Sequence, residues 1–366
     1  MIIRVLSLEN LEEDPTLESL QRLDIAHQKQ HTFNMHPAEK SLTEPPSTLT
    51  ETLHTTPHTK KHRGEGGSLL SNLKQQPFSA RANIKQLISN TNLSFETKAT
   101  YMLDQLANTG ILGLIQGLAE WLPISSTGHL KIAEHYLGLT TTPLFNLILH
   151  LGTLIVVIFY FRHDIINILS ALVHGDLKSE AGKLVLPIIV ATVPTAIIGL
   201  LYVQLLEDTL QRLLIIGITF IIGATLVYTS RTGKEDADNV TYRIALLMGV
   251  AQGLAIFPGL SRSGATISTA LLLGLKREKA FKFSFLLSIP AILGDTAVEA
   301  YKTRGQIALS GIGYPEVLVG VAIAMIVGYI AIRIVSKAVK SKKFHYFAIY
   351  TWLLGITIIA LALGGY

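Results

Sequence analysis

From Met102 onward the sequence is a series of long apolar segments separated by short polar ones, and this pattern restricts the fold more than any other feature. Six segments are long enough, at about 1.5 Å per residue, to cross a hydrocarbon core of roughly 30 Å with help from their flanks. They are Leu144 to Phe161, Leu184 to Val203, Leu213 to Ser230, Phe283 to Tyr301, Pro315 to Ile332 and Phe344 to Leu363. Because lipid offers the backbone no hydrogen-bond partners, we predict an all-α polytopic membrane protein rather than a soluble enzyme.

Two further apolar segments, Gly110 to Leu139 and Ile244 to Leu275, are interrupted near their centres by proline, glycine and a run of hydroxyl residues. Each predicts a helix, a polar loop and a second helix. Irregular backbone at membrane depth is tolerated where it is buried in protein or lines a wet cavity, so such a helix pair can enter the membrane and return. The expected fold is therefore six transmembrane helices plus two re-entrant helix-loop-helix segments.

The two broken segments also resemble each other. Gln116 to Gly128 lies 136 residues before Gln252 to Gly264, and Gln, Gly, Leu, Ala, Ser and Gly recur in register. Three spans follow each broken segment, and an odd number of spans inverts the second copy relative to the first. We predict inverted repeats over about residues 106–230 and 242–366, with a site where the two broken segments meet near the midplane.

Residues 1–101 differ in composition from the rest of the chain. They contain eleven Lys and Arg, eleven Asp and Glu, and six of the twelve histidines, and they contain no apolar run long enough for a signal peptide or a span. We therefore predict a polar, disordered N-terminal extension over 1–101 and a membrane domain over 102–366. Two hypotheses for the extension stay open: Met102 is the natural start, or the extension is a lineage-specific tail.

Basic residues predict the orientation in the membrane. Four Lys and Arg residues fall in segments on one predicted side, and fifteen fall in segments on the other side. The positive-inside rule places the fifteen in the cytoplasm and the C-terminus outside the cell (plasma) membrane. We therefore attribute the net charge of +5 to topology and expect no nucleic-acid partner. The absence of cysteine excludes disulfides, thiolate nucleophiles and cysteine-based metal sites.

The second broken segment contains Arg262 between Ser261 and Ser263, with Gly259 and Gly264 on either side. An arginine at membrane depth costs roughly 2.5 to 3.5 kcal/mol on insertion scales, so it is rarely found there without a partner. A guanidinium matches phosphate oxygens, and glycines allow backbone N–H groups to approach the same anion. This loop is therefore a candidate anion site, and a solvated loop between two helices is the alternative.

The first broken segment contains the complementary groups. Glu120 and Gln116 lie four residues apart on one helical face, and Ser126 and His129 lie three apart, so an imidazole could reach a hydroxyl as its base. Structural roles are the alternative for each, because hydroxyls satisfy broken backbone, Gln joins helices, and a lone His often only packs. We interpret His150, in the middle of a span, as structural on the same grounds.

These two stretches resemble the motifs of the undecaprenyl-diphosphate phosphatase family, the bacitracin-resistance membrane phosphatases. The first motif is matched by Gln116, Glu120, Pro123, Ser125, Ser126, Thr127, Gly128 and His129, and the second by Pro258, Gly259, Ser261, Arg262, Ser263, Gly264 and Thr266. The resemblance covers Met102 to Tyr366. Gln116 departs from it, because many relatives have Glu there, and the change removes one charge from any metal site.

The resemblance implies hydrolysis of undecaprenyl or another polyprenyl diphosphate to the monophosphate and phosphate, which recycles the lipid carrier of cell-envelope glycan synthesis. The implied catalytic residues are Glu120, Ser126, His129 and Arg262, and the implied substrate-binding residues are Ser125, Thr127, Gly259, Ser261, Ser263, Gly264 and Thr266. A divalent cation, Mg²⁺ or Ca²⁺, is expected at Gln116 and Glu120. The nucleophile stays open between Ser126, His129 and water.

Two other functions compete with this interpretation. Ser261 and Arg262 begin the Ser-Arg-x5-His pattern of another lipid phosphatase superfamily, but position 268 is Ser, so that pattern fails. A transporter or flippase for a prenyl phosphate is the alternative from another class, because inverted repeats with broken helices are common in transporters. The expected partners are the polyprenyl diphosphate and the bilayer, and a homodimer stays open.

Overall fold

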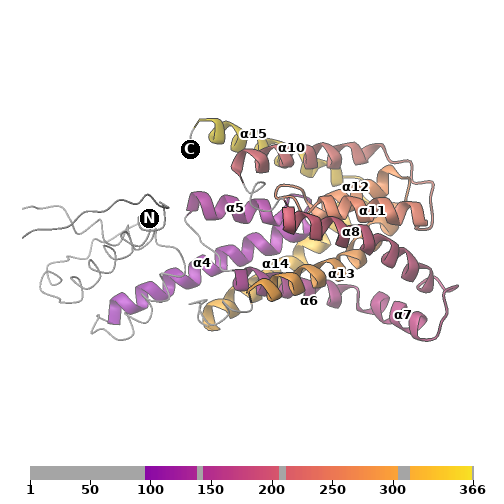
Figure 1. Ribbon diagram of the computed structural model, residues 1–366. Coiled ribbons are helices and arrows are strands. Elements are labelled where there is room, and N and C mark those ends of the chain that lie inside the picture. Colours follow the sequence, from indigo (N-terminus) through magenta and orange to yellow (C-terminus); the bar gives the residue numbers. More distant parts are fainter. Residues whose placement is uncertain (1–94, 138–142, 206–211, 304–313, 365–366) are drawn as a thin grey trace, which may run out of the picture. The chain divides into compact units, whose positions relative to one another are not determined.

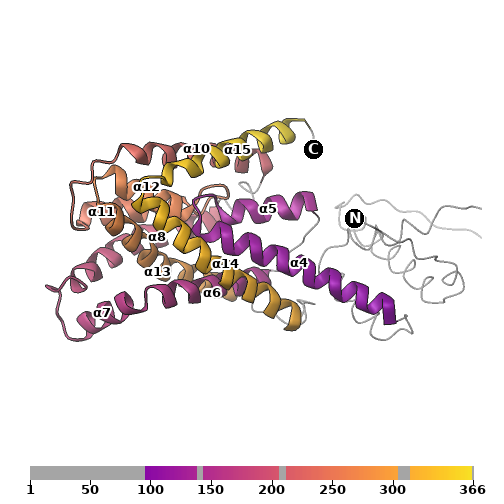
Figure 2. The same ribbon diagram turned by 180° about the vertical axis from the view of Figure 1, so that it is seen from behind.

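The computed structural model describes residues 95–137, 143–205, 212–303 and 314–364, all in the larger of two compact units into which the chain divides. This part of the chain is nearly all helical (Figures 1 and 2), and its only β feature is an isolated bridge between Ala237 and Leu275. The predicted all-α fold is therefore confirmed. Residues 1–94, which make up most of the predicted extension, lie outside the described residues.

Seven elements form the first half of the membrane domain. They are α4 (Phe95–Trp121), α5 (Ser126–Leu137), α6 (Pro143–Tyr160), α7 (Arg162–Val173), η1 (Gly182–Leu184), α8 (Val185–Leu205) and α10 (Leu213–Thr229). The turn η2 (Ser230–Thr232) leads into the second half. That half consists of α11 (Tyr242–Leu254), α12 (Arg262–Leu272), α13 (Arg277–Thr303), α14 (Tyr314–Lys340), η4 (Phe344–Tyr346) and α15 (Phe347–Leu363).

All six predicted spans coincide with helices. Five helical stretches in the described residues are long and apolar enough to cross a membrane, corresponding to α8, α10, α13, α14 and α15. A sixth is obtained if α6 and α7 count as one span bent by 79°. The two broken segments form helix pairs, α4 with α5 and α11 with α12, as the interrupted apolar pattern predicts.

Two parts of the chain differ from the prediction. Helix α4 begins at Phe95, so the prediction of disorder is wrong for residues 95–101. No Gly or Pro lies between Phe95 and Gly110. A helix that is already stabilised by packing after Gly110 can therefore extend toward its N-terminus with little loss of free energy. Helix α7 was also not predicted, because its basic start at Arg162 indicates a polar connection. Ile166, Leu169 and Leu172 form an exposed apolar stripe along it.

The first helix of each half packs against a helix of the other half, and the two contacts involve equivalent helices. Helix α4 packs mainly on α14 of the other half, and its counterpart α11 packs mainly on α8. Two other pairs of equivalent helices contact each other directly, α10 with α15 and α6 with α13 (Figure 1). A two-fold relation between the halves would produce such a set of equivalent contacts. It supports the inverted repeat, which stays a prediction.

Glycines allow the closest of these contacts. A Cβ added at Gly113 of α4 would collide with the backbone of Gly320 on α14, and one at Gly249 of α11 would collide with the backbone of Ala191 on α8. Gly113 and Gly249 are 136 residues apart, which is the offset of the sequence repeat. Small residues permit such close helix approach in membrane proteins. The repeat therefore extends from the loops into the helix packing.

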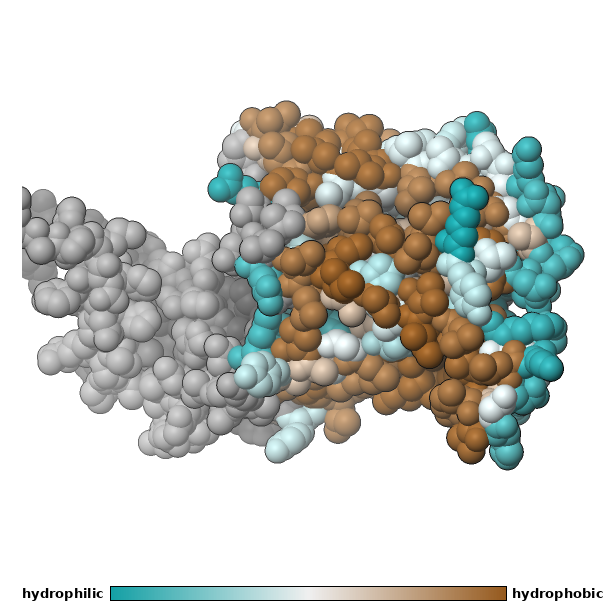
Figure 3. Space-filling model, turned by 45° about the vertical axis from the view of Figure 1, so that its right-hand side comes forward, coloured by the Kyte–Doolittle hydropathy of each residue, from teal (hydrophilic) through white to brown (hydrophobic). Residues whose placement is uncertain are grey.

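Most of the charged side chains of the predicted cytoplasmic connections gather at one end of the membrane domain. Figure 3 shows this hydrophilic end beside a broad hydrophobic band. Ion pairs link the connections there: Lys282 with Asp164, Lys279 with Glu180, Lys276 with Asp238, Arg277 with Glu235, and Lys340 with Glu278. The segments that the basic-residue count assigns to one side of the membrane therefore lie together.

Candidate active site

The loops of the two broken segments contact each other directly. The backbone N–H of Gly259 donates to the hydroxyl of Ser125 at 3.2 Å. The hydroxyl of Ser261 donates to the carbonyl of Leu122 at 3.4 Å. Because α5 begins right after the first loop and α12 right after the second, two helix N-termini start at this junction. Such termini present free N–H groups and a partial positive charge, which favour anions.

Local backbone geometry explains why these loops need their particular residues. Ser125 has a φ of 72° and Gly259 a φ of 99°, both in the left-handed region. A Cβ at Gly259 would also collide with the Thr219 hydroxyl and the Ile216 carbonyl, so only glycine fits. Ser261 caps α12 by accepting the N–H of Gly264 at 3.1 Å. The loop geometry therefore depends on small and hydroxyl residues.

Glu120, in the last turn of α4, is the centre of the site. Its side chain is fully buried, and its Oε1 forms an ion pair with Nη2 of Arg262. Its Oε2 accepts hydrogen bonds from the Ser126 hydroxyl at 2.7 Å and from Nε2 of Gln116 at 3.0 Å. A buried carboxylate is costly unless it is paired and hydrogen-bonded, and here both oxygens have partners. The two broken segments therefore meet as predicted at Glu120 and Arg262, whereas the hydrogen-bond partners of His129 lie elsewhere.

The sequence repeat reappears in these contacts. Ser126 is the first residue of α5 and Arg262 the first residue of α12, and they are 136 residues apart. Both bind Glu120, one at each carboxylate oxygen. Ile256 stands at the position of the second copy that corresponds to Glu120. Two equivalent helix starts therefore converge on a carboxylate that only one copy provides.

His150 of α6 also reaches this carboxylate. Its Nε2 lies 3.6 Å from Oε2 of Glu120, while its Nδ1 lies 2.8 Å from the carbonyl oxygen of Asn146, one turn earlier. The hydrogen bond to Asn146 agrees with our interpretation of His150 as structural, but the proximity to Glu120 was not predicted. The signal was present in the sequence, because an ionisable residue inside an apolar span is a functional candidate by default.

Arg262 retains unused binding capacity. Its Nη1 is buried and has no hydrogen-bond partner among the described residues, although Nη2 pairs with Glu120. A small cavity of about 10 Å³ lies beside the pair, and Ser263 together with Ser284 and Ser288 of α13 also lines it. A buried guanidinium nitrogen without a partner is unfavourable unless a ligand supplies an acceptor. Nη1 is thus suited to an anionic oxygen.

His129 faces a different neighbour from the one we expected. Its Nδ1 lies 2.7 Å from the Ser125 carbonyl oxygen, and its Nε2 lies 2.7 Å from the hydroxyl of Tyr350 on α15. A carbonyl only accepts, so Nδ1 carries the proton and Nε2 accepts from the tyrosine. Ser126 donates to Glu120, and no Ser126–His129 hydrogen bond forms. Tyr350 was missed, because nothing distinguishes it from other aromatic residues near span ends.

The remaining predicted binding residues divide into two groups. The hydroxyls of Ser261 and Ser263 are buried and lie 3.2 Å apart, close to Arg262 in the second loop. Thr127 is exposed in the first turn of α5. The Thr266 hydroxyl donates to the Arg262 carbonyl at 2.8 Å, and its oxygen lies 2.5 Å from the hydroxyl oxygen of Ser284. The structure therefore does not bring Thr266 to the carboxylate.

The predicted metal ligands are adjacent, but they form a small set. Gln116 donates its Nε2 to Glu120, and its Oε1 is buried without a hydrogen-bond partner in the described part of the chain. The described residues contain no group of three or more His, Cys, Asp or Glu side chains that could hold a metal. One carboxylate and one amide oxygen match a divalent cation that takes its other ligands from phosphate and water.

Comparison with known proteins gives consistent matches. The family model described as Bacitracin resistance protein BacA matches residues 109–357. An undecaprenyl-diphosphatase of Carboxydothermus hydrogenoformans is 42% identical over 264 residues, covering 70% of this chain and 97% of the relative. One of Korarchaeum cryptofilum is 40% identical over 267 residues, covering 70% and 99%. One of Methanosphaera stadtmanae is 36% identical over 278 residues, covering 71% and 99%. Both broken segments lie inside the family match.

Proposed function

Since the chain belongs to the bacitracin resistance protein BacA family, we propose that it hydrolyses undecaprenyl diphosphate to undecaprenyl phosphate and inorganic phosphate. It is a multi-pass membrane protein with its site among the apolar helices. This placement suits a substrate whose prenyl tail stays in lipid while its diphosphate reaches the polar groups of the two loops. The product would return a lipid carrier to cell-envelope glycan synthesis.

The buried, unpaired Nη1 of Arg262 is the observation that carries this proposal. A diphosphate oxygen would satisfy it with a charge-assisted hydrogen bond. The N-termini of α5 and α12 would add backbone N–H groups, and the hydroxyls of Ser261 and Ser263 would add further donors. Donors fixed in place before the substrate arrives stabilise charge that develops during phosphoryl transfer.

For the chemical step we favour Ser126 as the nucleophile and Glu120 as the acceptor of its proton. The hydroxyl already donates to Oε2 of Glu120 at 2.7 Å, which is the geometry that a base requires. Attack of the Ser126 oxygen on the terminal phosphorus would form a serine–phosphate bond and break the bond to the bridging oxygen. The prenyl monophosphate leaves, and water then releases phosphate and restores the serine.

His129 defines the alternative chemical step. With the proton on Nδ1, its Nε2 lone pair could accept a proton from an attacking water once Tyr350 releases it. This route needs no covalent intermediate. Trapping a phosphoenzyme in the wild type that is absent from Ser126→Ala would support the serine route. Full turnover by Ser126→Ala would leave the water route.

We further propose that Gln116 and Glu120 bind a divalent cation, Mg²⁺ or Ca²⁺, together with the substrate. Glu120 offers the carboxylate and Gln116 a buried amide oxygen without a hydrogen-bond partner. When bound, such a cation would disperse charge on the leaving phosphate. The protein groups hold the diphosphate by themselves through Arg262 and the two loops.

We also propose that the charged end of the domain faces the cytoplasm and that the C-terminus lies outside. The support is the clustering at one end of the connections rich in Lys and Arg. A C-terminal epitope tag that is accessible in intact cells would agree with this orientation. A tag that becomes accessible only after the cells are permeabilised would contradict it. Homodimerisation stays a prediction.

The decisive test is phosphate release from undecaprenyl diphosphate by the purified protein in detergent. Arg262→Ala should abolish release, while Arg243→Ala, which removes an exposed arginine outside the site, should leave it unchanged. Release by Arg262→Ala at the wild-type rate would contradict the site. If the wild type releases no phosphate with any divalent cation, the hydrolase proposal fails and transport of a prenyl phosphate becomes the better explanation.

A further inference from the structure

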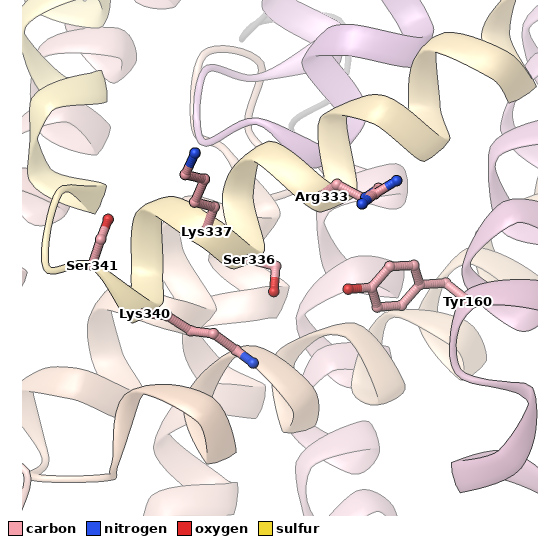
Figure 4. A pocket seen from close by; sticks show the side chains of 6 residues that line it. All are labelled: Tyr160, Arg333, Ser336, Lys337, Lys340 and Ser341. Atoms are coloured by element: carbon pink, nitrogen blue, oxygen red, sulfur yellow. The ribbon is translucent and has the colours of Figure 1, made fainter.

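A second polar pocket lies at the C-terminal end of α14, away from Glu120 and Arg262. It has a volume of about 500 Å³, and its lining residues are Tyr160, Arg333, Ser336, Lys337, Lys340 and Ser341. Figure 4 shows the Tyr160 hydroxyl directed toward Ser336 and the Lys340 ammonium extending into the same region. None of these residues belongs to the candidate active site. The pocket therefore needs an explanation of its own.

The pocket carries an excess of positive charge. Arg333 and Lys337 have no carboxylate partner among the described residues, and the guanidinium carbon of Arg333 lies 6.0 Å from the centroid of the Tyr329 ring. Lys340 is the exception, because it pairs with Glu278 at 3.0 Å. Three cations and three hydroxyls line the pocket and offer many donors and few acceptors, although the Lys337 ammonium points away from Tyr160 and Lys340 (Figure 4). Such a set recognises phosphate rather than a carbohydrate or a cation.

The surface next to the pocket is apolar. Ile326 and Ile330 are exposed on α14, about two turns and one turn before Arg333, and Ile334 is exposed beside it. A ligand bound at Arg333 would therefore have a hydrophobic path toward the membrane interior. A free phosphate would leave this path unused, whereas a lipid would place its headgroup on the cations and an acyl chain along the isoleucines.

We propose that this pocket binds the phosphate headgroup of an anionic phospholipid from the surrounding leaflet. Arg333 and Lys337 supply the charge, Ser336 and the Tyr160 hydroxyl supply hydrogen bonds, and Ile326 and Ile330 contact an acyl chain. The site lies among the basic connections that the positive-inside rule places in the cytoplasm, where the membrane surface is negative. Bound lipid would hold α14 against α6, which supplies Tyr160.

The test measures how phospholipids raise the thermal unfolding midpoint of the purified full chain in detergent. Dioleoylphosphatidylglycerol is the anionic probe, dioleoylphosphatidylcholine is the neutral lipid, and inorganic phosphate represents a free anion. The variant Arg333→Gln with Lys337→Gln is compared with Arg243→Gln and Lys234→Gln, which also removes one arginine and one lysine. All four side chains are exposed, so neither pair should disturb the fold.

We expect phosphatidylglycerol to raise the midpoint of the wild type and of the control pair at similar concentrations. The pocket pair should need roughly 30-fold more lipid, since each basic residue near an anionic surface contributes a factor of about five. Arg333→Lys with Lys337→Arg should behave like the wild type, and phosphate release in lipid-free detergent should be the same in all variants. Equal responses of the two double-glutamine variants, or equal effects of both lipids, would overturn the proposal. A response to inorganic phosphate alone would also overturn it.

Discussion

Nε2 of His150 lies 3.6 Å from Oε2 of Glu120, so the carboxylate at the centre of the site has a neighbour from α6 as well as from both loops. This proximity makes a histidine inside a span a candidate for a role in the site. The imidazole is close enough to help to hold the Glu120 carboxylate in position while substrate competes for Arg262. Histidine would then support catalysis without touching the phosphate.

We therefore predict that His150→Ala lowers kcat about tenfold and leaves KM within about threefold of the wild type. Loss of a polar contact with a buried carboxylate costs about 1.4 kcal/mol, which is a factor of ten in rate. Steady-state kinetics of phosphate release provides the measurement. Asp295→Ala, an exposed acidic position on α13, is the control. An unchanged kcat in His150→Ala would show that the 3.6 Å contact has no catalytic role.

The Glu120–Arg262 ion pair predicts that stability and activity can be separated. Glu120→Ala leaves a buried guanidinium without its partner and should destabilise the fold by about 3–5 kcal/mol. Replacing both residues by Gln removes both charges, so most of the stability should return while phosphate release stays absent. Thermal unfolding and turnover are measured in parallel. Activity in the double variant would mean that the pair is structural only.

Gly259 provides a test of the loop geometry. Gly259→Ala should destabilise the protein by more than about 2 kcal/mol and reduce phosphate release strongly, because its φ of 99° and its neighbours exclude a Cβ. Gly294→Ala on α13 is the matched control, since a Cβ there meets nothing within 4 Å. It should be neutral or stabilising by up to about 1 kcal/mol. Equal unfolding midpoints for the two variants would refute the argument.

The cation proposal predicts the effect of adding a carboxylate. Gln116→Glu places a second negative charge beside Glu120, so the protein without metal should unfold at a lower temperature than the wild type. Mg²⁺ or Ca²⁺ should raise that midpoint at lower concentration than in the wild type, because ligand charge increases cation affinity. Phosphate release should then also reach half its maximum at lower metal concentration. A variant whose midpoint does not respond to either metal would exclude this position as a ligand.

Glu235 predicts a pH dependence of stability outside the membrane spans. Burial raises the pKa of Glu235, but the hydrogen bond and charge of Arg277, together with the charge of Lys342, outweigh it and leave the pKa lowered. Oε1 of Glu235 lies 2.8 Å from Nε of Arg277 and 3.4 Å from Nζ of Lys342. A carboxylate with a lowered folded-state pKa stabilises the fold above its unfolded pKa, and this stability is lost as pH falls through the folded value.

Glu235→Gln should therefore be less stable than the wild type at about pH 7, by about 1 kcal/mol. The difference should shrink below the ordinary value of 4.5 and vanish once the wild-type carboxyl is protonated. Thermal unfolding midpoints between about pH 7 and pH 3 would measure it. Asp238→Asn, in an exposed pair with Lys276, should show a smaller difference throughout. A difference that does not change with pH would contradict the linkage.

The spans and the two loops could be predicted because their signals are local. Apolar runs of sufficient length specify helices in lipid, and the repeat of Gln116 to Gly128 at Gln252 to Gly264 relates the loops before any contact is known. The pairing of Glu120 with Arg262 followed from that relation. A buried arginine needs an anion, and the other loop contains one.

The partners of His129 could not be predicted, because they depend on long-range packing. Tyr350 is 221 residues away on α15 and approaches His129 only through the contact of α15 with α10. Spacing alone favoured Ser126 as the histidine's partner, but the carbonyl of Ser125 lies at the i−4 position and takes Nδ1. Helix α7 was missed for a different reason, since its charged start hides the apolar stripe that follows.

The two helix starts that converge on Glu120 imply a limit on how such a site can arise. Two identical half-proteins, paired as a symmetric dimer, would each carry the same residue at the position shared by Ser126 and Arg262. Such a symmetric dimer would place either two serines or two arginines at the starts of the two helices. Joining the halves in one polypeptide removes this restriction, because each copy can then mutate separately. The difference between the serine and the arginine therefore requires two unlike halves, and separating the halves would preserve it only if both unlike pieces were expressed together.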